Sequence, residues 1–329
     1  MGKKKKAFYK KWWFWVIVII FIGALAGGSS STNSGNDSVG DVQTVGENEK
    51  KEDIKEIYLL GEVAELKDIS LQVTAVEYNQ GTEFDKPKAD HEFAIVNVSI
   101  KNTSESIQSY NVYNFSVQNG NGQIENQTFT TINSESALGS GEITPGGIVS
   151  GSIAFEVPKN DTALKLLFSD NVFSDKNIVF DLVNSLDTFE VIKGEKVAIG
   201  DDLPKIGEAV DFKNMRVTVD SVEKSSGDQF NKPSTGNEYV IVTITLENID
   251  SEVQSYNPFN FKLQNGYGTI QDQAFTTINS ETAMSSGELA PGGKFTSTIT
   301  FEAPIDDEEL GLIYEPNWLI GETAMISLK

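Results

Sequence analysis

Few side chains in this sequence of 329 residues are suited to covalent chemistry. The chain has no cysteine, and its single histidine, His91, lies in a polar stretch. Neither a thiolate nucleophile nor a disulfide framework is therefore available. One histidine cannot form a histidine-rich zinc site, and nucleophilic catalysis that depends on histidine has no other base. We expect His91 to lie in an exposed loop without a catalytic role.

Acidic side chains are abundant, with 48 Asp and Glu. A glycosidase needs two carboxyl groups about 5–10 Å apart across a cleft, and no spacing here singles out such a pair. The acidic runs 201–202 and 306–309 lack the alternating ligands and the glycine of a dedicated calcium loop, so calcium stays an alternative for them. Phosphate-binding and nucleophile-elbow motifs are absent from the sequence. We assign no catalytic, cofactor-binding or metal-binding residue and expect no enzyme.

The charge of the chain is unevenly distributed. Residues 1–28 contain six lysines and no acid, so the rest holds 20 basic residues against 48 acidic ones, a net charge of −28. Such a surface repels nucleic acid and anionic lipid. The charge excludes a nucleic-acid partner and is typical of a domain kept soluble outside the cell.

The basic N-terminus precedes a hydrophobic segment. Residues 1–11 form a lysine-rich tip, and 12–26 are uninterruptedly apolar, with Trp12, Trp13 and Trp15 at the start. A positive flank on one side only predicts a single-pass anchor over 12–28, with the N-terminus in the cytoplasm and the domains outside. The run is short for a membrane of ~30 Å, and 24–26 match a signal-peptidase site. Secretion after cleavage at Ala26 is the alternative.

The remainder of the chain contains one domain twice. Residues 29–53 are rich in Ser, Gly, Asn, Asp and Glu and predict a disordered stalk. After a shift of 146 positions, 61–158 aligns with 207–304 without a gap, with 44 identities in 98 positions. A repeat this long is a duplicated domain rather than a solenoid unit. We predict domain 1 at 54–183 (copy 1), a linker at 184–200 and domain 2 at 201–329 (copy 2).

Within each copy the hydrophobic period is two. Residues 69–76 and 93–100 alternate apolar with polar side chains, as do the matching runs in copy 2. Strict alternation over five to ten residues predicts strands with one wet face. The turn dipeptides Asn119-Gly120 and Asn265-Gly266, and a Pro-Gly-Gly before the last long strand, separate these runs. The predicted fold is all-β: two tandem immunoglobulin-like antiparallel sandwiches of seven or eight strands.

Three aromatic positions are shared by the copies: Tyr110/Tyr256, Phe115/Phe261 and Phe129/Phe275. They could line a ligand groove, but in a sandwich without a disulfide we expect them to fill the cores. The shared Asn-Ser-Glu at 133–135 and 279–281 is expected to be a loop that fixes its own backbone through side-chain hydrogen bonds.

The chain also resembles a bacterial family of extracellular domains of unknown function. The resemblance rests on Gly61-Glu62 at the start of the domain, the strand 92–102, and the ending at 141–147 and 151–158, which copy 2 repeats. These domains are immunoglobulin-like sandwiches related to a mycobacterial immunoprotective antigen. The entry into the hydrophobic segment at 10–15 is similar to that of membrane-attached members. The resemblance implies fold and location, and no activity.

A non-enzymatic cell-surface protein is therefore the leading hypothesis. Its two sandwiches would bind an extracellular protein or an envelope polymer, or act as a spacer. The alternative is a sensor or accessory subunit of an envelope complex, whose residues 12–28 contact a partner in the membrane. A secreted protein or an extracellular hydrolase is a further alternative.

Overall fold

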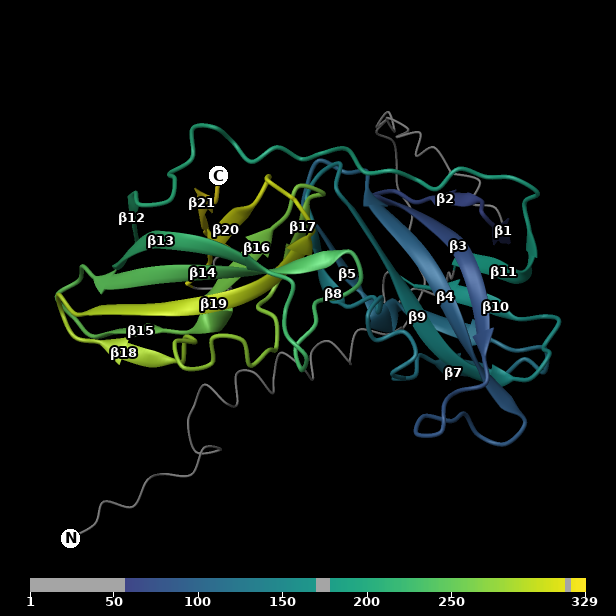
Figure 1. Cartoon of the computed structure of the whole chain (residues 1–329). Coiled ribbons are helices and arrows are strands. Elements are labelled where there is room, and N and C mark those ends of the chain that lie inside the picture. Colours follow the sequence, from purple (N-terminus) through teal and green to yellow (C-terminus); the bar gives the residue numbers. More distant parts are fainter. Residues whose placement is uncertain (1–56, 170–177, 317–320) are drawn as a thin grey trace, which may run out of the picture. The chain divides into compact units, whose positions relative to one another are not determined.

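The computed structural model describes residues 57–169, 178–316 and 321–329 (Figure 1). The two copies belong to one compact unit, which extends to Lys329. The predicted tip, anchor and stalk at 1–11, 12–28 and 29–53 lie outside the described residues. Among the residues that are described, no helix combines the length and the apolar character needed to cross a membrane.

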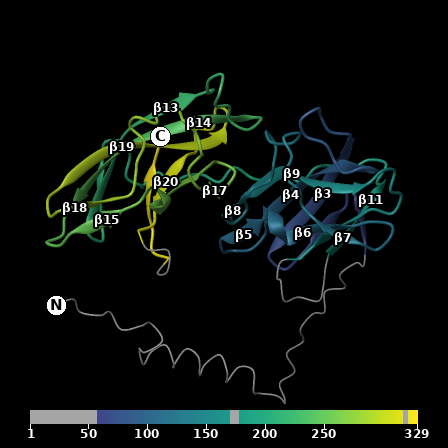
Figure 2. The ribbon, with the colours of Figure 1, turned by 90° about the horizontal axis from the view of Figure 1, so that it is seen from below.

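Copy 1 is a sandwich of two sheets. The first has the order β2-β3-β4-β9 and the second the order β1-β11-β10-β6-β7. The long strands β3, β4 and β9 run side by side (Figure 2). The bounds are β1 Tyr58–Leu60, β2 Val63–Glu65, β3 Ile69–Asn79, β4 His91–Asn102, β5 Gln108–Asn111, β6 Phe115–Gln118, β7 Ile124–Asn126, β8 Ser140–Ile143, β9 Ile148–Pro158, β10 Lys165–Phe168 and β11 Ile178–Ser185.

Copy 2 repeats this arrangement at positions shifted by 146. One sheet has the order β12-β13-β14-β19, and β21-β20-β16-β17 form the other face. Both copies carry a β-bulge at the same place, after Val73 and after Val219. The bounds are β12 Ala209–Phe212, β13 Met215–Ser225, β14 Asn237–Asn248, β15 Gln254–Tyr256, β16 Phe261–Gln264, β17 Thr269–Gln271, β18 Gly287–Leu289, β19 Lys294–Pro304, β20 Gly311–Tyr314 and β21 Ala324–Ser327.

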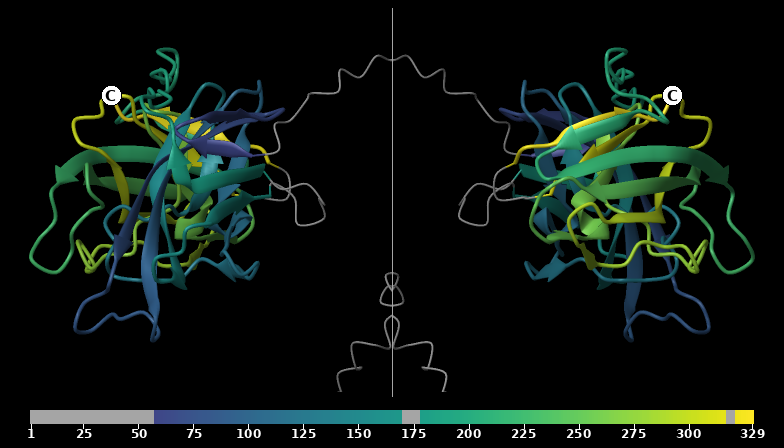
Figure 3. Two further views of the ribbon diagram at one scale, coloured as in Figure 1. Left: turned by 90° about the vertical axis from the view of Figure 1, so that its right-hand side faces the viewer. Right: turned by 90° about the vertical axis from the view of Figure 1, so that its left-hand side faces the viewer.

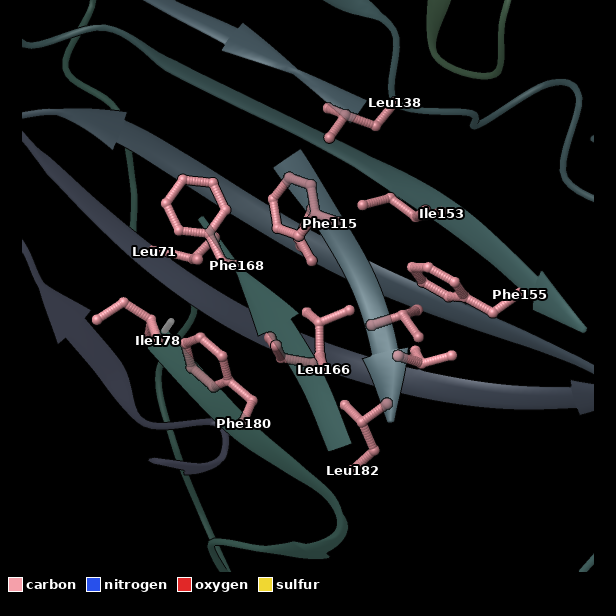
Figure 4. Packing of buried hydrophobic residues seen from close by; sticks show 14 of the residues in the cluster. Leu71, Phe115, Leu138, Ile153, Phe155, Leu166, Phe168, Ile178, Phe180 and Leu182 are labelled. Atoms are coloured by element: carbon pink, nitrogen blue, oxygen red, sulfur yellow. The ribbon is translucent and has the colours of Figure 1, made fainter. Parts of the chain in front are cut away.

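Each core lies between its two sheets because alternate side chains of facing strands point inward. In copy 1 the fully buried side chains include Phe115, Phe155, Leu166 and Phe180 (Figure 4). In copy 2 Phe261 and Phe301 occupy the equivalent places. The predicted all-β repeat is confirmed. The predicted antiparallel pairing is also confirmed for the strands described, with one exception, since β1 pairs with β11 in parallel.

The segment after copy 1 is attached to both copies. Gln72 donates from Nε2 to the carbonyl oxygen of Glu190 at 2.9 Å, and its Oε1 accepts from the backbone N–H of Ile192 at 2.9 Å. Further along, the N–H of Val197 donates to the carbonyl oxygen of Gly266 at 2.9 Å, and Ile199 is buried. These hydrogen bonds tie the connecting backbone to the surface of each sandwich.

Candidate binding site

The shared aromatic residues do not all fill the cores as predicted. Four lie in or against a core: Tyr110, Phe115, Tyr256 and Phe261. For Phe129 and Phe275 the prediction was wrong, because their side chains are 82% and 91% exposed. Both lie in irregular backbone, where alternation does not report burial. An exposed phenylalanine at the same position of two copies that differ elsewhere points to a role outside folding.

A second pair of phenylalanines is exposed in the same way. Phe84 and Phe230 are 95% and 84% exposed, in the turns that join β3 to β4 and β13 to β14. These turns extend past the strands that they connect (Figure 3). Sequence reasoning missed this pair, although Gly81, Phe84, Lys86 and Pro87 are all repeated in copy 2. A shared large apolar residue inside a run of turn residues was the available signal.

Hydrogen bonds hold the two phenylalanine-bearing segments of copy 1 together. Oδ2 of Asp85 accepts from Oγ1 of Thr130 at 2.6 Å, from the backbone N–H of Thr131 at 2.6 Å and from Oγ1 of Thr131 at 2.9 Å. Since these bonds stabilise the carboxylate, with the hydroxyl of Thr130 first, the pKa of Asp85 lies below its ordinary value of 3.8. Asp85 follows Phe84 and Thr130 follows Phe129, so one carboxylate fixes both aromatic positions.

We call this set of hydrogen bonds to one side-chain oxygen the clamp. In copy 2 the accepting oxygen belongs to an amide instead of a carboxylate. Oδ1 of Asn231 accepts from Oγ1 of Thr276 at 2.9 Å, from the backbone N–H of Thr277 at 3.0 Å and from Oγ1 of Thr277 at 3.2 Å. The three donors match those of copy 1 although the acceptor residue differs. The arrangement of the two loops is therefore retained while the charge at their junction is not.

The turn that carries the first phenylalanine requires a glycine. Gly81 and Gly227 have φ values of +86° and +85°, which side-chain-bearing residues rarely adopt. A Cβ on Gly81 would lie 2.4 Å from the carbonyl oxygen of Asp85, and one on Gly227 would lie 2.1 Å from that of Asn231. Each turn is closed by a backbone hydrogen bond of 2.8 Å, such as that from Thr82 to Asp85. The exposed rings are thus displayed on a constrained backbone.

A second recurring feature lies toward the other end of β4 and β14. Copy 1 has a pocket of about 470 Å³ and copy 2 one of about 750 Å³. Ten lining positions are equivalent in the two pockets. In copy 1 they are Leu66, Lys67, Asp68, Ile69, Gln108, Ser109, Tyr110, Asn111, Asn114 and Phe168, and in copy 2 each is shifted by 146.

Many polar groups of these pockets already have structural partners. Asn111 and Asn257 each accept from a backbone N–H in a short 3-10 turn, η2 (Val112–Asn114) or η3 (Pro258–Asn260), at 2.9 Å. Burial raises the pKa of Tyr110 to about 12, so its hydroxyl stays protonated. Because its amides are used to hold strands and turns, the pocket is a weaker candidate than the phenylalanine loops.

Two family matches span most of the described sandwiches. The family model described as a domain of unknown function, DUF4352, matches residues 58–178 and 204–325. The chain belongs to this family. The resemblance stated from the sequence is thereby confirmed in both copies.

Three solved structures that are similar to this chain come from bacteria. The yjhA protein of Bacillus subtilis is 21% identical, over 39% of this chain and 100% of its own, with a TM-score of 0.34. A putative lipoprotein of the same organism, ycdA, is 20% identical over 36% and 37%, with a TM-score of 0.32. An uncharacterised β-sandwich protein of Clostridium difficile 630 is 15% identical over 40% and 98%, with a TM-score of 0.28. None of the curated proteins matches.

The residues first considered for chemistry have structural places in the DUF4352 copies. His91 begins β4 and is half-buried, not in an exposed loop as expected, and its Nδ1 lies 2.9 Å from the carbonyl oxygen of Ala89. Asp307 is buried and accepts from the backbone N–H of Gly266 at 2.7 Å. Within the described ranges, no three His, Asp or Glu side chains lie close enough together to hold a metal ion.

The Asn-Ser-Glu loop fixes its backbone only in part. Oγ of Ser134 donates to the carbonyl oxygen of Thr131 at 3.0 Å, inside the loop as predicted. Asn133 instead donates from Nδ2 to Oγ of Ser152 on β9 at 3.0 Å. This bond secures the loop that carries Phe129 to the sheet beneath it.

Proposed function

We propose that this protein is a non-enzymatic, cell-surface binding protein that uses the exposed phenylalanine loops of both DUF4352 copies. The observation that carries the proposal is the recurrence of two highly exposed phenylalanines on a clamped loop pair in each copy. Exposed apolar side chains that are held in place, rather than left on mobile loops, lose little entropy when a partner covers them.

The location proposed for these domains rests on the N-terminal sequence. Six lysines before the apolar run 12–26, and acidic material after it, favour a single-pass anchor with the domains outside the cell. The stalk at 29–53 would give the sandwiches reach from the membrane. We further propose that each sandwich is of the immunoglobulin type, on the strength of its two facing sheets and its Greek-key-like strand order.

The partner that fits best is a neutral surface of an extracellular protein or an envelope polymer. Thr130 and Thr131 lie beside Phe129 in copy 1, and Thr276 and Thr277 lie beside Phe275 in copy 2. Their hydroxyls donate within the protein and keep oxygen lone pairs that can accept hydrogen bonds from a partner. A shallow depression of about 400 Å³ adjoins Phe275. Aromatic faces with flanking hydroxyls suit partners that offer apolar patches and hydrogen-bonding groups together. Two linked sites would raise the avidity for a repetitive partner without any new contact.

The test is a binding comparison with the full-length chain displayed in vesicles. Envelope polymers and extracellular proteins are offered to the wild type, to a Phe84→Ala/Phe129→Ala variant, to the equivalent variant of copy 2, and to a variant that combines all four changes. Loss of one pair should weaken retention by about two to four orders of magnitude, the avidity that a second linked site contributes. Loss of both pairs should abolish it.

The control removes another exposed aromatic pair. Tyr113 and Phe259 are 67% and 58% exposed and lie in the 3-10 turns η2 and η3, outside the clamped loops. Alanine at these two positions should leave retention unchanged. Equal loss in the control and in the four-fold variant would assign binding to general apolar exposure. Retention of no partner by the wild type would favour a spacer.

A further inference from the structure

The two copies share one continuous sheet, with the order β21-β20-β16-β17-β8-β5. At the junction β17 of copy 2 pairs antiparallel with β8 of copy 1, with Ile270 opposite Glu142 and Thr269 opposite Ile143. The backbone N–H of Thr144 also donates to the carbonyl oxygen of Gly268 at 2.8 Å. Edge-to-edge pairing between domains is therefore a feature of this fold.

Glycines permit the close approach at this junction. A Cβ on Gly147 would lie 2.8 Å from the carbonyl oxygen of Tyr267 and 3.0 Å from Cα of Gly268. Such distances are closer than a side chain tolerates, so the junction depends on a glycine in each copy. One ion pair adds to it, since Nζ of Lys262 lies 3.2 Å from Oε2 of Glu142.

The junction uses a different edge of each copy. Copy 1 contributes β8 to the junction, and copy 2 contributes β17. The strand of copy 2 that is equivalent to β8 is β18, and the strand of copy 1 that is equivalent to β17 is β7. The junction uses neither β18 nor β7. Within the described part of the chain, β18 pairs only with β15, and β7 pairs only with β6. Such a head-to-tail contact leaves one complementary edge at each end of the molecule.

Side chains at the paired edges are buried, whereas the equivalent side chains at the unpaired edges are exposed. Ile270 is 3% exposed on β17, whereas the equivalent Ile124 on β7 is 60% exposed. Thr144 is buried beside β8, whereas the equivalent Ala290 beside β18 is exposed. Unpaired edges with exposed apolar side chains are templates for the addition of another strand.

We propose that a second copy of this chain occupies these edges, with β7 of one molecule pairing with β18 of the next in the register that β17 adopts on β8. That register places Ile124 opposite Glu288. The close approach remains possible, because Gly122 and Gly293 stand where the internal junction has Gly268 and Gly147. Since the two ends of each molecule are complementary and not identical, the contact propagates as an open row of molecules.

This contact is weaker than the internal junction. Ser116 stands in the place of Lys262, so the ion pair with the acid on the facing strand is lost. The net charge of −22 also makes molecules repel one another. Added salt should screen this repulsion and strengthen the association.

Cysteine crosslinking of the full-length chain tests the proposed register, because the natural sequence has no cysteine. One preparation carries Ile124→Cys and another carries Glu288→Cys. Residues directly opposite in an antiparallel pair have Cα atoms within the range that a disulfide can span. Mild oxidation of the mixture in micelles should shift the band from the mass of one chain to that of two, more strongly at high salt.

Two controls make the result decisive. Glu142→Cys with Ile270→Cys in one chain should crosslink internally, which checks the register of the template. Ile305→Cys, a 56% exposed position outside both edges, replaces Ile124→Cys in the negative control and should give no dimer with Glu288→Cys. A chain that carries both Ile124→Cys and Glu288→Cys should give a ladder of dimers, trimers and longer species.

A second measurement needs no crosslink. Sedimentation of the full-length protein should show a mass that rises with concentration and salt. Ile124→Glu should abolish the rise because it places a second carboxylate directly opposite Glu288 in the proposed register, whereas Ile305→Glu should not. Equal crosslinking in the negative control, or a wild-type mass that stays constant at all concentrations and salt levels, would overturn the proposal.

Discussion

Replacing either of two phenylalanines of copy 1 by alanine should change the free energy of unfolding by very different amounts. Phe115 is 1% exposed between the sheets, and Phe129 is 82% exposed on its loop. Replacing a buried phenylalanine by alanine typically costs about 3–5 kcal/mol, because burial is lost and a cavity is left. Full burial of such a side chain is worth about 1.5–3 kcal/mol. Less than a fifth of Phe129 is buried, so its loss should cost less than about 0.6 kcal/mol.

The assay is urea unfolding of the full-length chain in detergent, followed by far-ultraviolet circular dichroism. Phe115→Ala should shift the copy 1 transition to lower urea, and Phe129→Ala should leave it almost unchanged. Phe261→Ala and Phe275→Ala provide the same comparison in copy 2. A loss of more than about 1.5 kcal/mol on Phe129→Ala would mean that this ring is buried in solution. The exposed loops could then not be the binding surface.

Four further outcomes follow from the local contacts. Asn102 is fully buried and donates to two backbone carbonyls at 2.7 and 2.8 Å. Asn102→Ala should lower the free energy of unfolding in urea by about 2–5 kcal/mol, because both carbonyls lose their partner. A loss below about 0.5 kcal/mol would contradict this. The hydrogen bonds of the clamp lower the pKa of Asp85. The stability that they contribute is therefore fully present above the ordinary pKa and is lost as the pH falls through the lowered pKa. Hydrogen exchange in acid should show the clamped loops of copy 1 opening, whereas those of copy 2, held by Asn231, should stay closed. Asp85→Asn should preserve the copy 1 loops at neutral pH, whereas Asp85→Ala should expose them to protease; equal cleavage of the two variants would refute the clamp. Gly81→Ala should loosen the same turn, and unchanged protection there would show that the turn tolerates a Cβ.

Local features of the sequence predicted the strands and the repeat well. Alternation at 69–76 and 93–100 correctly located β3 and β4. The wet face that it predicted for 93–100 was wrong, since every residue there except Asn97 is buried and Ile132 packs against Phe93 and Ile95. The same signal could not assign Phe129, since its segment is irregular and has no period. It also could not predict the parallel pairing of β1 with β11, which joins residues more than a hundred positions apart.

By itself, the sequence determined the period-two strands, the duplication and the charge asymmetry, because each depends on residue types and on spacing along the chain. The tertiary structure alone decided which shared aromatics are buried, that Asp85 and Asn231 form the same clamp, and that β8 and β17 join the copies. The physical reason is that burial and edge pairing depend on which distant segments meet. Phe115 and Phe129 are both shared by the two copies, yet one is buried in the core and the other is exposed.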